Sequence, residues 1–148
     1  MPPPTKKLIV ATELLESALR LHYEGGSDFS ALHLAGGAEE LLGKHLTALG
    51  EESSFESLKT AAVRLSKFVD EGGTESAPKA IAAVMNHAKN STKHMDGAAD
   101  DTVHFDARAE AHDILDRAVT NYYQLMQTYE LRETELIRRF NRELGGGA

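Results

Sequence analysis

The chain has 148 residues, no Cys, 16 Lys and Arg, 23 Asp and Glu, and a formal net charge of -7. This length fits one domain with a single core. The lack of Cys excludes disulfides, thiolate nucleophiles and Cys-based zinc sites, and it fits a reducing compartment, so we expect a cytoplasmic protein. The acidic balance argues against general nucleic-acid binding, which needs cations to neutralise phosphates, so any such contact must be local.

Both ends of the sequence predict flexible segments. Three prolines stand at positions 2 to 4, and the sequence closes with GGGA. Neither stretch can build a packed face, so we expect one domain over residues 8–144 between flexible ends at 1–7 and 145–148. The apolar run LIVA near the start is too short for a signal sequence or a membrane span, and no membrane contact is expected.

The apolar residues between these ends recur at helical spacing, and the alternating strand pattern does not appear, which predicts an all-α fold. Five helices are expected, in chain order: residues 5–23, ending at Gly25-Gly26; a helix from a Ser27 or Asp28 cap to Gly50; residues 53–72, ending at Gly72-Gly73; residues 76–95, opening at Ser76 with Pro78 in the first turn; and residues 106–129, with an extension to 144 left open. The short connections predict an up-and-down antiparallel bundle of four to five helices.

The second predicted helix has two glycines, Gly36 and Gly37, in its middle. Each costs about 1 kcal/mol relative to Ala in a helix interior, so some other interaction should offset the loss. Small residues beside them give a face that another helix can approach closely: Ala31, Ala35 and Ala38. Packing within the chain, a dimer contact and a ligand groove are the three alternatives.

The third predicted helix has a capping box, in which Ser53 precedes Glu56 by three residues. Its apolar residues at helical spacing are expected to face the core: Leu58, Ala62, Leu65 and Val69.

The fourth predicted helix is the longest stretch without Asp or Glu, and it carries a positive patch. At about 100° per residue, Asn86, Asn90 and His94 stack on one face, and Lys89 and Lys93 form an adjoining stripe. The apolar residues of this helix should point into the bundle: Ala80, Ile81, Val84 and Ala88. We therefore expect the polar groups to be partly exposed along the rim.

This combination of side chains has a specific chemistry. A His with its ordinary pKa exchanges a proton near neutral pH, an Asn orients a phosphate or the imidazole, and a Lys neutralises developing phosphoryl charge. Such a set can cleave RNA without a metal, using the ribose 2′-OH as nucleophile. The alternative is a solvated helix face that is basic without any catalytic role.

The run KNSTKH resembles the motif of the HEPN superfamily, in which an Arg, usually a polar residue, three more residues and a His follow one another. Lys89 stands in the Arg position, Asn90 in the polar position and His94 in the His position. Two further segments, ALHLAGGAEELLGK and FDARAEAHDILDRAVTNYY, look like segments of uncharacterised bacterial HEPN-like proteins. The similarity covers most of residues 8–129.

The resemblance implies a bundle of four or five helices, commonly a homodimer that brings two motifs together. Active members of the superfamily cleave RNA without a metal, often as the toxin of a toxin–antitoxin pair or in phage defence. Carried over to this chain, His94 would be the general acid/base, Asn90 the orienting residue and Lys89 the phosphate contact. Neighbouring residues are expected to bind the RNA substrate: Lys93, Asn86 and His87.

Lys89 departs from the superfamily motif, because an ammonium cannot reproduce the planar fork that a guanidinium offers to phosphate. A second hypothesis is therefore a non-enzymatic interaction module, such as an antitoxin or the companion of a nucleotidyltransferase. Three arginines near the C-terminus could supply the missing guanidinium across a dimer: Arg138, Arg139 and Arg142. Glu39 and Glu40 either reach the motif from the second helix or belong to a solvated face.

The connection before the fifth helix is rich in potential metal ligands: Asp96, Asp100, Asp101, His104 and Asp106. These side chains could hold a hard divalent ion, or be solvated with Asp106 capping the helix. They could also fold over the basic patch and mimic phosphate. No Glu has a His three residues later, which excludes the di-iron bundle pattern, and no metal or cofactor is expected.

Overall fold

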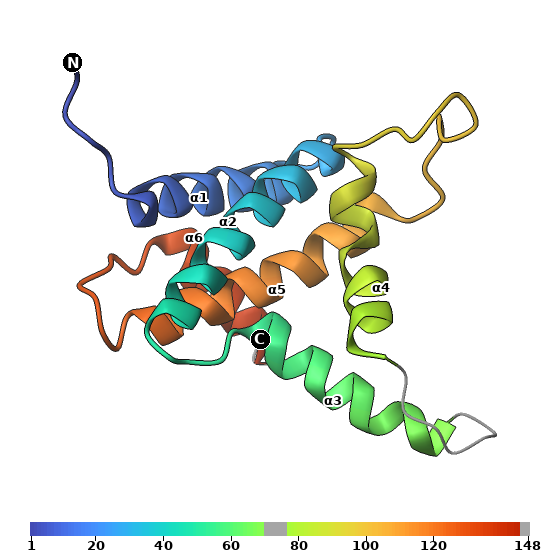
Figure 1. Ribbon diagram of the computed structural model, residues 1–148. Helices are drawn as coiled ribbons and strands as arrows, with labels where there is room; N and C mark the ends of the chain where they lie inside the picture. The colour runs from blue at the N-terminus through green and yellow to red at the C-terminus, as the bar shows by residue number, and fades with distance from the viewer. Residues whose placement is uncertain (70–76, 146–148) are drawn as a thin grey trace.

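The computed structural model describes residues 1–69 and 77–145, apart from the side chains of Lys67 and Val69. These residues form six α-helices and no strand (Figure 1): α1 Lys7–Glu24, α2 Asp28–Ala48, α3 Ser54–Val69, α4 Pro78–Ser91, α5 Ala107–Leu125 and α6 Glu135–Leu144. The all-α prediction is therefore confirmed. Three predicted features lie outside the described residues: the helix end at Gly72-Gly73, the helix start at Ser76 and the tail beyond Gly145.

The core lies between α1, α2 and α5, with α2 packed against both of the others (Figure 1). Gly25 and Gly26 have φ values of 75° and 83°, a left-handed conformation that glycine adopts without strain. They allow α1 and α2 to follow each other through a short turn and to lie side by side. The largest fully buried side chains come from these three helices and α6, among them Leu15, Leu32, Leu115, Tyr122 and Phe140. Each buried Leu contributes about 2 kcal/mol of hydrophobic stabilisation. No helix in the described ranges combines the length and apolarity needed to cross a bilayer.

Helices α3 and α4 extend away from this core and form an arm, which we call the α3–α4 arm (Figure 1). The two helices contact each other, and the arm joins the core where α3 meets α5 and α4 meets α2. Ser53 is the N-cap of α3, as the capping box predicted, because its Oγ accepts a hydrogen bond of 3.2 Å from the Glu56 N–H.

The prediction of which residues of α3 and α4 face the core is partly wrong. Leu58 is exposed, Leu65 is 61% exposed, and on α4 Val84 is 76% exposed. The physical reason is that the arm packs on few neighbours, so α3 buries only one of its two apolar stripes. The predicted inward position of Val69 lies outside the described side chains.

The expected single C-terminal helix is in fact two helices, which corrects the prediction of residues 106–129 with an extension to 144. Asp106 caps α5 as predicted, accepting hydrogen bonds from the N–H groups of Arg108 and Ala109. Helix α5 ends at Leu125, the Tyr122 hydroxyl then donates to the Arg132 carbonyl at 2.5 Å, and Thr134 caps α6. The reversal brings Ile137 and Phe140 back onto the core, which a continuous helix would carry away from it.

Helix α6 docks against a buried histidine, His22. The Phe140 ring contacts the His22 ring edge-on, with 6.1 Å between the ring centres, and its centre lies 5.2 Å from that of the His112 ring. Burial lowers the pKa of His22 from its ordinary value of 6.5, and the positive charges of Arg108 and His112 lower it further, while Asp28 and Glu143 oppose the shift. The folded chain therefore resists protonation of His22.

We expect the stability of the chain to fall as the pH drops below about 6.5. The unfolded chain binds a proton at His22 at its ordinary pKa, whereas the folded chain binds it only at lower pH, so acid favours unfolding in this window. Thermal unfolding at a series of pH values checks this, with His22→Leu as the comparison. The decline should be shallower in the variant, and equal declines would contradict the assignment.

Candidate functional site

Helix α4 carries the motif residues along the junction between the arm and the core. Pro78 stands in its first turn, where the missing N–H costs no helical hydrogen bond. The helix ends at Ser91 rather than near residue 95, so His94 lies just beyond it, with its N–H bonded to the Asn90 carbonyl at 3.0 Å. Ala88 and Lys89 are the buried residues of α4 and mark the side that meets the core.

Lys89 is buried, with 8% of its surface exposed, which corrects the expectation that it lies accessible on the rim. Its side chain passes over Gly36 of α2, where an added Cβ would lie 2.7 Å from Lys89 Cγ and 2.8 Å from Cδ. Its Nζ then reaches Glu39 Oε1 at 3.5 Å and Glu40 Oε2 at 3.8 Å. The two glutamates do reach the motif, and Gly36 supplies the space that the Lys89 stem occupies.

Arg117 of α5 completes a buried ion cluster, which we define as Glu39, Lys89 and Arg117. Arg117 Nε donates a hydrogen bond to Glu39 Oε2, and both side chains are almost fully buried. The Arg117 guanidinium also lies 5.9 Å from the centre of the Phe55 ring. The cluster therefore joins α2, α4 and α5, with α3 beside it. In the sequence Arg117 is one charged residue among many on its helix, and no motif identifies it.

Two buried polar atoms near the ion cluster have no hydrogen-bond partner in the part of the chain that the structure describes: Arg117 Nη2 and Asn86 Oδ1. Asn86 lines a pocket of about 160 Å³, together with Glu39, Glu40, Ser53 and Phe55 among others. It therefore faces α2 and α3. Asn90 and His94 do not line this pocket, although Asn86 and Asn90 are one helical turn apart on α4.

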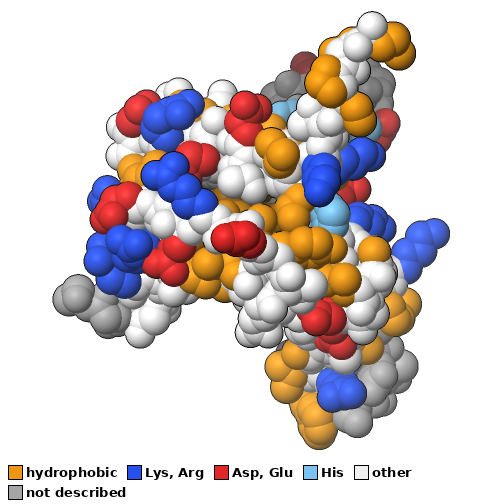
Figure 2. Space-filling model, turned by 90° about the vertical axis from the view of Figure 1, so that its left-hand side faces the viewer, with side chains coloured by type: hydrophobic (Ala, Val, Ile, Leu, Met, Phe, Trp, Pro, Cys, Tyr) orange, Lys and Arg blue, Asp and Glu red, His pale blue; other side chains and the backbone are white. Residues whose placement is uncertain are grey.

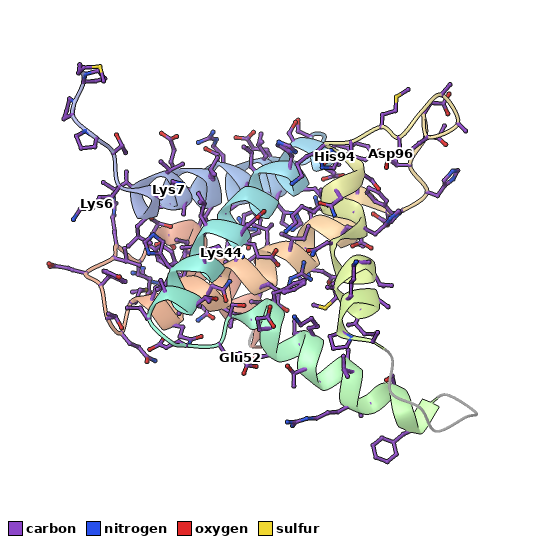
Figure 3. The ribbon with its side chains drawn as sticks, viewed as in Figure 1. Lys6, Lys7, Lys44, Glu52, His94 and Asp96 are labelled. Atoms are coloured by element: carbon purple, nitrogen blue, oxygen red, sulfur yellow. The ribbon has the colours of Figure 1, made fainter. Side chains whose placement is uncertain are left out.

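A second hollow, of about 600 Å³, lies at the C-terminal end of α4. Its polar lining residues are His87, Asn90, Ser91, His94, Asp96 and Asp100. Figure 3 shows His94 and Asp96 at this end of α4, away from Lys44, which lines the other pocket. The hollow thus joins three predicted site residues, while Lys89 points into the core and Lys93 is exposed just past the helix.

The acidic connection contributes to this hollow through Asp96 and Asp100. The Asp96 N–H donates to Asp100 Oδ2 at 2.8 Å, which holds the two residues together. Their carboxylates would repel a phosphate at the same place. Within residues 1–69 and 77–145, no three His, Asp or Glu side chains come together in a way that could hold a metal ion.

No protein-family model, curated protein or solved structure matches the chain. Membership of the HEPN superfamily therefore stays a prediction.

The contact between Gly36 and Lys89 gives a testable consequence. Gly36→Ala is expected to destabilise the chain by about 1–3 kcal/mol, because the new methyl would overlap the middle of the Lys89 side chain. In a Lys89→Ala background the same change should stabilise by up to about 1 kcal/mol, the ordinary helix preference of Ala over Gly.

Urea unfolding measures both values, with Gly37→Ala as a matched control. An added Cβ at Gly37 would lie 3.3 Å from the end of the Leu14 side chain, a contact that a small shift relieves. A stabilising effect of Gly36→Ala in the otherwise unaltered chain would show that Lys89 does not occupy this space.

Proposed function

We propose that the chain is a non-enzymatic helical interaction module built on an HEPN-like up-and-down bundle. One observation carries the proposal: the cation in the Arg position of the motif, Lys89, lies in a buried ion cluster with Glu39 and Arg117. A phosphate contact requires that cation at the surface beside His94. A cytoplasmic location fits the absence of Cys.

The ion cluster suits a structural role. The Glu39 carboxylate lies between the two cations, and Lys89 also faces the more exposed Glu40. Breaking a buried ion pair costs far more than breaking a surface pair. Withdrawing Lys89 to contact RNA would leave Glu39 paired with Arg117 alone and would empty the space over Gly36. The ion cluster therefore favours a structural role for α4, in which Lys89 holds the helix against the core, over a catalytic role.

The second candidate is metal-independent RNA cleavage, and it is favoured by the hollow that His87, Asn90 and His94 share. In this alternative His94 is the general acid/base, Asn90 orients the phosphate and Lys93 takes the place of Lys89. A homodimer would bring two such hollows together, with Arg138, Arg139 or Arg142 of the second copy as the guanidinium. The carboxylates of Asp96 and Asp100 would first have to move away.

Incubation of purified protein with single-stranded RNA in excess EDTA separates the two candidates. We expect no cleavage above that of a His94→Ala preparation, because the motif lacks its surface cation. His104→Ala serves as the control for an exposed His outside the hollow. Cleavage by the unaltered chain and by His104→Ala that is lost in His94→Ala would overturn the proposal in favour of the ribonuclease.

A further inference from the structure

Helix α6 is the shortest of the described helices and lies on α1 and α5 as a cover. Its two buried side chains, Ile137 and Phe140, attach it to the core. Its outer side is charged, and Figure 2 shows Lys and Arg side chains mixed with Asp and Glu on the left of the molecule, where α6 lies. On that side Arg138 and Arg139 form ion pairs with nearby glutamates. The two apolar side chains are therefore the main anchors of α6.

Beneath α6 lies the imidazole of His22, which is 5% exposed. Its Nδ1 is buried and has no hydrogen-bond partner in the part of the chain that the structure describes. A protonated imidazole donates from both ring nitrogens. In the folded chain the Nδ1 proton would therefore have no acceptor, and a buried charge without a partner is strongly disfavoured.

The cations around His22 add to this cost. Arg108 of α5 donates a hydrogen bond of 3.0 Å from Nη1 to the His22 carbonyl. The His112 ring, also on α5, has its centre 6.0 Å from that of the His22 ring. A charge on His22 would thus lie beside one permanent cation and a second imidazole.

Two carboxylates also lie near this imidazole, and both already have partners. Asp28 of α2 pairs with Arg108 at 3.4 Å. Glu143 of α6 accepts a hydrogen bond of 2.8 Å from the Tyr23 hydroxyl and pairs with Arg139 at 3.1 Å. The described helices around the ring therefore supply no free carboxylate to a proton on the imidazole.

We propose that α6 is a lid that mild acid opens: protonation of His22 lifts α6 from α1 and α5, while α1, α2 and α5 stay packed together. Water then reaches the imidazole, and the side chains of Ile137 and Phe140 become exposed. The inference is independent of the proposed function, because it involves neither α4 nor the hollow beside His94.

Opening at α6 is the least costly way to hydrate His22. It exposes the two anchors of α6, whereas separating α1 from α2 or α5 would expose most of the fully buried core. Native proteins open locally at the segments that make the fewest buried apolar contacts. The lid should therefore open before the chain unfolds.

The pKa of His22 sets the window in which the lid opens. Burial lowers this pKa below 6.5 in the closed state, and the charges of Arg108 and His112 lower it further. In the open state the pKa returns to its ordinary value, so protons bind preferentially to the open state once the pH falls below about 6.5. Glu143 keeps its charge in this window, because the hydrogen bond from Tyr23 lowers the pKa of Glu143 below 4.5.

The chain has no Cys, so a single introduced thiol reports on one helix. Ile137→Cys places the thiol on the buried side of α6, and Leu32→Cys places it in the fully buried core of α2. Ile9→Cys on α1, where the side chain is 61% exposed, corrects for the pH dependence of the thiol itself. The rate of reaction with dithiodipyridine is measured for each variant. Between about pH 7.5 and about pH 5.5 we expect the rate for Ile137→Cys, relative to that for Ile9→Cys, to rise about tenfold, while Leu32→Cys stays protected.

Two further variants assign the effect to His22. Adding His22→Leu to Ile137→Cys should remove the rise, and adding His33→Leu, which replaces an exposed His on α2, should keep it. Hydrogen exchange of the unaltered chain, followed by mass spectrometry and corrected for the intrinsic effect of pH, gives the same comparison of α6 with α2 if the new thiol loosens the lid. The inference is overturned if the relative rate rises less than about twofold, if the rise persists with His22→Leu, or if α6 and α2 become accessible together.

Discussion

Replacing Glu39 with Gln is expected to lower the free energy of unfolding by about 3–5 kcal/mol. Gln has nearly the same size as Glu, so the expected loss of stability comes from the missing negative charge. Arg117 and Lys89 would remain beside each other in the interior without the carboxylate that compensates both. Urea unfolding followed by circular dichroism gives the value. The effect is large because the Glu39 side chain is only 3% exposed.

Glu40→Gln is the matched control for Glu39→Gln. Glu40 is the next residue on α2 and also faces Lys89, but its side chain is 53% exposed. Solvent screens that pair, so we expect a change below about 1 kcal/mol. Similar values for the two variants would show that the ion cluster is solvated and does not hold the helices together.

Replacing Phe140 with Ala should cost about 3–5 kcal/mol, the range for a buried aromatic side chain in a packed core. Phe140 is the largest anchor of α6, with only 1% exposed, and lies against the rings of His22 and His112. Its loss would leave a cavity between α6 and the helices that it covers.

Thermal and urea unfolding of Phe140→Ala measure this cost. Val84→Ala on α4 provides the comparison, because that side chain is 76% exposed and its truncation should change stability by less than about 1 kcal/mol. A small loss for Phe140→Ala would mean that α6 contributes little to the folded core.

The ends of several helices could be predicted from the sequence because glycines and capping residues stand at them. Gly25, Gly50, Ser53 and Asp106 lie at helix ends in the sequence and in the structure. The break between α5 and α6 has only the Thr134 cap as a mark, since residues 126–134 contain neither Gly nor Pro. It depends instead on tertiary packing of Phe140, which local patterns do not reveal.

The candidate site could be predicted only in part. The spacing correctly brings Asn90 and His94 together, and the two helical glycines indicated an offsetting interaction, which at Gly36 is the passage of Lys89 within the same chain. The inward direction of Lys89 depends on Glu39 and Arg117, which lie about 50 and 28 residues away in the sequence. A single sequence gives no information about such distant pairs.

The central claim is that the Lys89 ammonium stabilises the core rather than a phosphate. A double-mutant cycle of Lys89→Met and Glu39→Gln, measured by urea unfolding, tests it most directly. We predict that the double variant is more stable than the sum of the two single losses implies, with a coupling of about 1–3 kcal/mol. Additive losses, with coupling below about 0.5 kcal/mol, would contradict the claim.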